Sequence, residues 1–251
     1  EIMPSLVGSE MCIRDSRYTI FSLPYLFKGQ DHYYSAMANS TAIRELFDAT
    51  EDAGYIAIGY YCNGARNFYL KDDVAVTSPD VLKGKKIRSM VSSTSMDMIE
   101  AMGGSPVPMS SSETYTSLQQ GIVDGAENTE LALTVDKHEE IVKSYTYTEH
   151  QYTPDIYIIS TKVWNKLTKE QQDYLRECFS KLNDNFVQKY NQMMDDAMAE
   201  AESYGVHVYR DIDKTPFIEA VQPIHEEFLA KGEQYQKLYD DIQSYAEDTD
   251  K

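Results

Sequence analysis

Three polar residues of this chain form a set suited to binding a planar anion. Arg66 ends the segment NGAR, Arg88 ends KKIR, and Asn128 ends VDGAEN. Each comes where an apolar run gives way to polar residues, as when a strand ends in a loop. A guanidinium pairs with both oxygens of a carboxylate, and an amide both donates and accepts hydrogen bonds. The residue types therefore predict the capture of an organic acid.

The sequence offers little that could transform such an acid. The five histidines and three cysteines lack the spacing of a metal or redox site, and neither a phosphate-binding glycine loop nor a nucleophile elbow is present. Glu127 could act as an acid or base, but one carboxylate without an oriented second group is a weak catalytic signal. We favour a structural role for it, as the partner of a neighbouring amide or arginine. We therefore expect no catalysis, no cofactor and no metal.

The overall charge excludes several classes of partner. The chain of 251 residues has 23 basic and 41 acidic residues, a formal net charge of −18. Such a surface repels phosphate backbones and anionic lipids, so we expect neither nucleic acid nor a membrane surface as partner. Hydrophobic residues make up 42%, enough for a folded core. An anionic ligand is repelled by this net negative charge, so it needs a local positive site. The two arginines could supply that site, which makes them more informative.

Residues 1–16 differ from the rest of the chain. They have neither the basic start nor the sustained apolar run of a signal peptide, and no periodicity links them to the residues that follow. The stretch 5–16 is similar to a translated sequencing adapter. We predict a non-native leader and a gene cut on its N-terminal side; a genuine floppy terminus is the alternative. No apolar run in the sequence approaches the ~20 residues of a membrane helix.

Strand-like and helix-like segments alternate along the chain, which predicts an α/β architecture. The pair Asn63-Gly64 predicts a turn after the first strand, and the continuous apolar character of that strand is typical of a parallel sheet. The expected strands are 55–61, 86–89, 106–109, 123–127, 155–160 and 206–209, and the expected helices are 33–53, 79–83, 95–102, 110–120, 168–204 and 217–230.

One expected helix is unusually long. Thr168 and Gln171 have the spacing of a capping box, and apolar residues then recur every three or four positions until Gly205. At 1.5 Å per residue this helix would be roughly 50 Å long. A modest domain is about half as wide, so we expect the helix to span two lobes or to bend at their junction.

Six segments, in this order and at this spacing, resemble the solute-binding receptors of tripartite ATP-independent periplasmic (TRAP) transporters. Each segment is modest alone, but the combination is highly specific, and the similarity covers Tyr18 to about Glu227. The segments are LPYLF (23–27), NGAR (63–66), LKGKKIR (82–88), PVPM (106–109), ETYTSLQQG (113–121) and VDGAEN (123–128).

The resemblance implies a two-lobed α/β fold like that of periplasmic binding proteins, with a ligand cleft between the lobes and a long helix spanning them. We assign 17–61 and 153–190 to lobe 1, and 62–152 and 191–251 to lobe 2. The family has about one more βαβ stretch and a secretion signal before Phe21. We therefore expect an incomplete lobe 1, and lower stability and weaker binding for the chain as written than for a restored gene.

The resemblance also implies roles for the three polar residues. Arg88 matches the arginine that makes the main carboxylate pair, Arg66 a second arginine that closes on the anion, and Asn128 a polar contact.

Four further residues are candidates for the pocket wall. Ser89 begins the stretch SMV where the family usually has a proline shortly after the strand arginine, and Ser111 stands where an aromatic residue is common. Tyr115 and Tyr152 are candidates to lie beside the pocket. The two departures make it doubtful to carry over a particular ligand from the family.

The function implied is a monomeric receptor outside the cytoplasm, in the periplasm, that delivers an organic acid to a TRAP membrane permease. Sugar acids such as hexuronates and C4-dicarboxylates are the candidate ligands, and the hydroxyl-rich wall slightly favours sugar acids. Two alternatives stay open at this point. The chain could be the extracellular sensing subunit of a signalling system, or, more distantly, an isomerase or lyase that uses Glu127.

Overall fold

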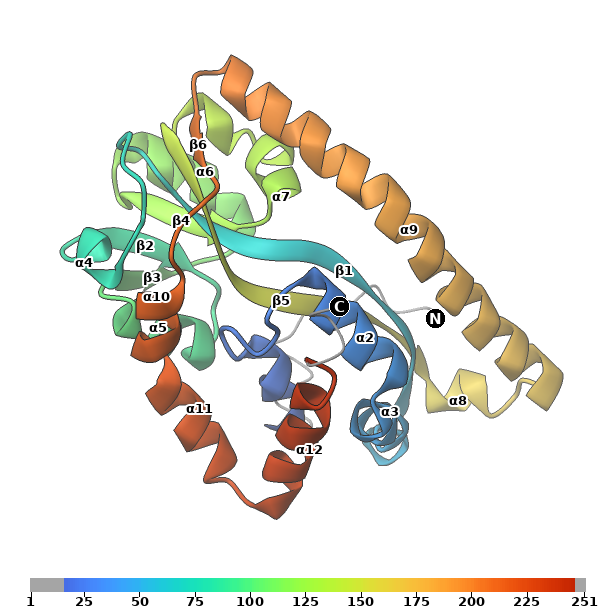
Figure 1. The fold of residues 1–251 in the computed structure, drawn as a ribbon. Coiled ribbons are helices and arrows are strands. Elements are labelled where there is room, and N and C mark those ends of the chain that lie inside the picture. Colours follow the sequence, from blue (N-terminus) through green and yellow to red (C-terminus); the bar gives the residue numbers. More distant parts are fainter. Residues whose placement is uncertain (1–15, 247–251) are drawn as a thin grey trace.

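The computed structural model describes residues 16–246, apart from the side chains at positions 52, 63, 183–185 and 188. A six-stranded mixed sheet runs through this part of the chain in the order β3-β2-β4-β1-β5-β6 (Figure 1). Its strands are β1 (Tyr55–Leu70), β2 (Lys86–Ser89), β3 (Ser105–Pro108), β4 (Gly125–Asn128), β5 (Ser144–Ser160) and β6 (His207–Tyr209).

The two long strands β1 and β5 form an antiparallel ribbon that runs the length of the molecule (Figure 1). Their pairing extends from Tyr55 opposite Ser160 to Leu70 opposite Ser144. Of β1, only the last four residues pair with β4, which pairs on its other side with β2, and of β5 only the first three residues pair with β6. The short strands thus gather at one end of the ribbon, and the ribbon connects that end to the other lobe.

Helices cover both ends of this ribbon. The short helical turns are η1 (Ser16–Ser22), η2 (Glu51–Ala53), α4 (Pro79–Leu82), η3 (His138–Glu140) and α8 (Thr161–Trp164). The longer helices are α2 (Gln30–Asn39), α3 (Thr41–Asp48), α5 (Ser93–Ala101), α6 (Ser111–Gln120), α7 (Glu130–Val135), α9 (Lys169–Ser203), α10 (Thr215–Ala220), α11 (Gln222–Leu229) and α12 (Glu233–Gln243).

Separate apolar cores lie at the two ends of the ribbon. At the β4 end, alternate β1 side chains enter different cores: Phe68 packs with residues of α4, α5 and α10, and Tyr69 with residues of α6, α7 and α9. This alternation is the period of two that a strand imposes. At the other end, η1, α2 and α3 pack on the ribbon together with α11 and α12. The two-lobed α/β fold predicted from the sequence is confirmed.

The C-terminal helices pack differently from the predicted lobe boundaries. Tyr235, Leu238 and Ile242 of α12 share a core with Phe21 and Phe47, although 191–251 was assigned to lobe 2. The division into lobes otherwise stays a prediction, and most of the proposed leader 1–16 lies outside the described residues. The helix expected over 33–53 is broken into α2 and α3 at Ser40, whose hydroxyl caps α3 by accepting a hydrogen bond from the backbone N–H of Ile43.

Two expectations about the first strand are wrong. The strand does not stop at the Asn63-Gly64 pair but continues to Leu70, because the pair is absorbed as an irregularity in the pairing with β5 between Cys62 and Ala65. Gly64 supplies the positive φ of +82° that this irregularity requires. The neighbours of β1 in the described sheet, β4 and β5, are also antiparallel to it rather than parallel.

The capping box and the length predicted for the long helix are both confirmed in α9. Thr168 and Gln171 cap its first turn reciprocally, and its 35 residues span about 52 Å. Figure 1 shows it running past α7 at one end of the ribbon and reaching α8 at the other. Within the described residues, no helix combines the length and the apolar character needed to cross a membrane.

The position of Gly64 generates a test of the fold. A Cβ there would lie 2.6 Å from the hydroxyl oxygen of Tyr190 on α9, in addition to the strain of a positive φ. Gly84→Ala is the matched control, since Gly84 has φ +76° but nothing within 4 Å of an added Cβ. We expect Gly64→Ala to lower the free energy of unfolding by about 2–3 kcal/mol and Gly84→Ala by about 1 kcal/mol in urea titrations. Equal losses of unfolding free energy in Gly64→Ala and Gly84→Ala would mean that Tyr190 does not pack on β1.

Candidate functional site

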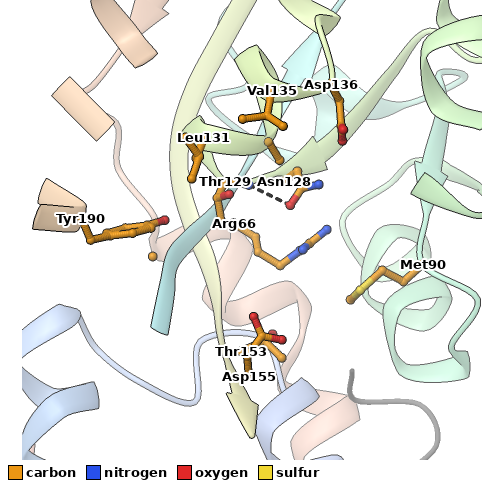
Figure 2. A pocket seen from close by; sticks show the side chains of 12 residues that line it. Arg66, Met90, Asn128, Thr129, Leu131, Val135, Asp136, Thr153, Asp155 and Tyr190 are labelled. Atoms are coloured by element: carbon orange, nitrogen blue, oxygen red, sulfur yellow. Dashed lines mark hydrogen bonds between the residues drawn. The ribbon is translucent and has the colours of Figure 1, made fainter. Parts of the chain in front are cut away.

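A cleft with a volume of about 330 Å³ opens where β1, β4 and β5 lie side by side (Figure 2). This size is sufficient for a small organic ligand. Its wall comes from the three strands, from α7 and its flanks, from the loop after β2, and from α9. The lining residues are Gly64, Arg66, Met90, Asn128, Thr129, Leu131, Ala132, Val135, Asp136, Thr153, Asp155 and Tyr190.

Arg66 lies inside β1 rather than at the strand end predicted from the sequence. Its Nε donates to Oε2 of Glu127 at 2.5 Å, and its Nη2 donates to Oε1 and to the backbone carbonyl of Glu127, both at 2.9 Å. Glu127 therefore has the structural role that the sequence favoured, as the partner of an arginine. Only the Nη1 end of the guanidinium stays clear of this pair, and Figure 2 shows the guanidinium projecting into the cleft.

Glu127 is held ionised although it is fully buried. Burial alone would raise its pKa, but the attraction of Arg66 and hydrogen bonds from His150 and Arg66 lower the pKa to about 2. His150 Nε2 lies 3.4 Å from Oε2 of Glu127, and its Nδ1 lies 2.9 Å from the hydroxyl of Thr148. Burial lowers the pKa of His150, so the ring is neutral at pH 7, with Nε2 donating to the carboxylate and Nδ1 accepting from Thr148.

Arg88 is a buried cation with little compensation from the protein. Its side chain comes from β2, and its Nε and Nη2 both donate to one acceptor, the carbonyl of Met109, at 3.2 and 2.9 Å. No carboxylate among the described residues forms a salt bridge with it. Burial lowers its pKa below the usual value, against the opposing attraction of Glu127, yet arginine stays charged in proteins. Arg88 adjoins the cleft, two residues before Met90, without lining it.

Asn128 ends β4, as the sequence predicted. It also lines the cleft, and its ligand role stays a prediction. Its Oδ1 accepts from the backbone N–H of Thr129, the N-cap residue that precedes α7. Its amide nitrogen donates to no group in the described part of the chain. Asn128 can thus offer donors to an anion in the cleft.

The four other predicted wall residues do not line this cleft. Ser89 is fully buried in β2, and the hydroxyl of Ser111 donates to Asp136 at 3.1 Å. Tyr115 donates to Glu140 at 2.8 Å, whereas Tyr152 packs in the first-lobe core against Tyr33. Ser111 acts on the cleft only through Asp136, and the ligand role of all four stays a prediction.

Several lining residues were not found from the sequence. Thr153 and Asp155 lie two positions apart on β5, so both side chains face the cleft, and the Thr153 hydroxyl is buried without a protein partner in the described residues. The spacing of two was the available signal, but the strand was expected to begin only at Asp155. Asp136 ends α7, and Leu131 and Val135 supply an apolar wall. No cluster of potential metal ligands is found among the described residues.

Comparison with known proteins decides the family. The model of a family described as bacterial extracellular solute-binding protein, family 7, matches residues 2–232. The chain belongs to this family. The match begins inside the segment predicted to be a leader, whose nature stays a prediction. Among relatives, the uncharacterized protein YiiZ of Salmonella typhimurium is 42% identical over 229 residues, which are 90% of this chain and 69% of that protein.

Solved structures of TRAP periplasmic solute-binding proteins are similar over nearly the whole chain. A TRAP periplasmic solute-binding protein of Anaerococcus prevotii with bound α/β-D-glucuronate matches with a TM-score of 0.89 and 34% identity, covering 97% of this chain and 79% of that one. A TRAP receptor of a Sulfitobacter species with bound β-D-galacturonate matches with a TM-score of 0.87 and 31% identity, covering 95% and 79%. The predicted TRAP resemblance is confirmed.

Membership of family 7 establishes the type of protein. Its members are periplasmic receptors that bind small organic acids and work with membrane permease components, and they are not enzymes. The acid-base role considered for Glu127 is therefore wrong, which agrees with its burial against Arg66 and His150.

The buried Arg66–Glu127 pair predicts a pH-dependent stability. Glu127→Gln should lower the free energy of unfolding at pH 7 by about 3 kcal/mol, because it leaves a buried guanidinium without its counter-charge. The pKa of Glu127 is lower in the folded than in the unfolded chain, where it is about 4.3. The stability from this ionisation is therefore present above about pH 4 and is lost as the pH falls toward 2.

The melting temperatures of the wild-type chain and of Glu127→Gln should be compared at pH 7, 5 and 3. We expect the difference between the two melting temperatures to become smaller as the pH falls. Glu177→Gln is the control, because Glu177 also pairs with a cation, Lys181, but is exposed on α9. The melting temperature of Glu177→Gln should differ little from that of the wild-type chain at every pH. A difference in melting temperature between Glu127→Gln and the wild-type chain that is as large at pH 3 as at pH 7 would contradict the ion pair.

Proposed function

We propose that this chain captures a hexuronate, a sugar acid with one carboxylate, in the periplasm and delivers it to a TRAP permease. The observation that carries this proposal is Arg88, whose buried guanidinium has one neutral carbonyl as its partner. A buried cation is costly unless it is paired, so this position favours an incoming anion. The proposal gives Arg88 the main carboxylate contact.

Two neighbouring groups complete the proposed carboxylate site. Asn128, whose amide nitrogen donates to no group among the described residues, lines the cleft together with Arg66. Arg88 lies close enough to Arg66 for the two charges to act on each other. Hydrogen bonds to charged groups contribute roughly 1.5–3 kcal/mol each. Three such contacts could provide much of the ~8 kcal/mol that corresponds to micromolar affinity.

The rest of the cleft suits the body of a sugar acid. Thr153 and Asp155 face the cleft from β5 and can bond to hydroxyl groups, whereas Leu131 and Val135 offer a surface for the C–H face of a ring. The two solved neighbours described above hold glucuronate and galacturonate. Both observations support a hexuronate over a C4-dicarboxylate.

Ligand binding and delivery are coupled by closure of the cleft. The ribbon of β1 and β5 joins the lobes, so a ligand that contacts residues along it favours the conformation in which those contacts are all made. Closure then changes the surface presented to the permease.

We expect the chain to act as a monomer. Light scattering coupled to gel filtration would check this, and a dimer at micromolar concentration would contradict it.

Charge removal at Arg88 tests the proposed function. Arg88→Ala should abolish the thermal shift that D-glucuronate or D-galacturonate gives in a melting assay, because it removes the main carboxylate contact. Arg88→Lys should retain only part of the shift, since lysine lacks the planar fork. The control is Lys85→Ala in the same segment, where the half-buried Lys85 pairs with Asp72 at 2.8 Å. If Arg88→Ala and Lys85→Ala lost the ligand-induced thermal shift equally, Arg88 would not be the main carboxylate contact.

A further inference from the structure

Glu130 is a buried carboxylate beside the cleft that the proposed ligand contacts leave unused. It is the first residue of α7, and its neighbours Thr129 and Leu131 both line the cleft (Figure 2). The Glu130 side chain is 7% exposed and lies behind this wall. Its Oε2 is buried without a hydrogen-bond partner among the described residues, and no cation among them forms an ion pair with it. A carboxyl group in such a position is costly to ionise.

The charged and titratable groups that act on Glu130, or on which its charge acts, come from β1, β5, α9 and the segment after β6; η3 adjoins the opposite end of α7. These groups are Cys62 of β1, Tyr145, Tyr147, Glu149 and Tyr152 of β5, Tyr190 of α9, and Arg210. Tyr147 favours the ionised form of Glu130 through a hydrogen bond, and the charge of Arg210 has the same effect. The Arg210 guanidinium is shared, because it lies 5.5 Å over the centre of the Tyr147 ring and 3.4 Å from Oε1 of Glu202.

Glu130 changes its charge near neutral pH. Burial raises its pKa to about 7, against the hydrogen bonds that favour the ionised form. Burial also raises the pKa of the four surrounding tyrosines above the usual value, and that of Cys62 to about 12, so these groups stay neutral. Glu149 forms an ion pair with Lys214. A change from pH 6 to pH 8 therefore adds a negative charge at Glu130 behind the cleft wall.

This charge reaches the cleft at Tyr190. The ionised form of Glu130 contributes to the raised pKa of the Tyr190 phenol, and Tyr190 lines the cleft. A negative charge that disfavours a phenolate at this position also disfavours an anion bound beside it. A proton on Glu130 and an organic acid in the cleft therefore favour each other, and this coupling is reciprocal.

We propose that Glu130 is a proton-binding site coupled to the cleft, so that the chain takes up a proton at this carboxyl group when it captures an organic acid. The acid then binds more tightly below neutral pH than above it, because the protonated carboxyl group does not repel the bound anion. This inference rests on the proposed function, since it needs an anion in the cleft.

Calorimetric titrations with D-galacturonate at pH 6, 7 and 8.5 measure the coupling. We expect the Kd of the wild-type chain to rise about fivefold from pH 6, where Glu130 is protonated, to pH 8.5, where it is ionised. Titrations at pH 7.5 in two buffers with different heats of ionisation should show that binding takes up a fraction of a proton.

Glu130→Gln places a neutral amide where the carboxyl group stands. We expect this variant to have the same Kd at pH 6 and pH 8.5, close to that of the wild-type chain at pH 6. Glu139→Gln is the matched control, because Glu139 is also buried, has a pKa raised by burial and has an Oε2 without a partner among the described residues, but lies on η3 and does not line the cleft. It should keep the pH dependence of the wild-type chain.

Tyr147→Phe tests the same carboxyl group without replacing it. The hydrogen bond from Tyr147 lowers the pKa of Glu130, so its removal should shift the change in affinity to higher pH. Melting curves establish whether each variant is folded, and Tyr147→Phe tests the proposal if Glu130→Gln is not.

The possible outcomes separate this inference from the proposed function. If D-galacturonate binds the wild-type chain as tightly at pH 8.5 as at pH 6, without proton uptake, the inference is overturned and the proposed function stands. A pH dependence that persists in folded Glu130→Gln, or that Tyr147→Phe leaves at the same pH, also overturns it, because another group would then carry the proton. If neither D-galacturonate nor D-glucuronate binds at any pH, the proposed function fails and the inference fails with it.

Discussion

The buried ion pair between Arg66 and Glu127 organises the centre of the molecule. Arg66 is on β1, Glu127 on β4 and His150 on β5, so this one cluster ties together three adjacent strands at the cleft. Burying such charges is costly, and the cost is offset only if their hydrogen bonds are satisfied. Here both carboxylate oxygens have donors, and the neutral His150 is fixed in one tautomer by Glu127, which can only accept a hydrogen bond from Nε2. The geometry of the strands and the charge of the site therefore depend on each other.

This arrangement assigns different tasks to the two arginines. Arg66 is locked to the fold, whereas Arg88 is buried and, in the part of the chain that the structure describes, donates its hydrogen bonds only to the Met109 carbonyl. The same pattern explains why Glu127 is unsuited to catalysis, since a carboxylate stabilised in its ionised form by two partners is a poor base. The chemistry of the cleft is thus recognition by fixed charges and fixed donors.

Local signals in the sequence predicted the local structure well. The capping boxes that begin α6 at Ser110 and α9 at Thr168 were visible as residue pairs three positions apart. Asn128 was correctly placed at a strand end, because a short strand bounded by polar residues shows its limits. Arg66 was wrongly located, since Asn63-Gly64 normally marks a turn and here accommodates an irregular strand; its ligand role stays a prediction.

Features that depend on distant contacts could not be predicted. The first half of β5 reads SYTYTEHQ, a polar run that suggests a loop, yet several of its polar side chains are buried and find partners, some of them far away in the sequence. His150, for instance, meets Glu127 and Thr148, and Gln151 donates to the carbonyl of Ser22. Asp155 and Thr153 were missed for the same reason, because only the full strand places them on the cleft.

The contact between Tyr190 and Gly64 has a mechanical consequence. Tyr190 lies near the middle of α9, and its ring rests on the irregular stretch of β1 that borders the cleft. The same helix is also held at its two ends, because Phe179 packs against Tyr157 of β5 and Met198 and Ala201 lie in the core beside Tyr69. A displacement of β1 at Gly64 would therefore be transmitted along α9 to both ends of the molecule, so a probe attached far from the bound solute could register its arrival.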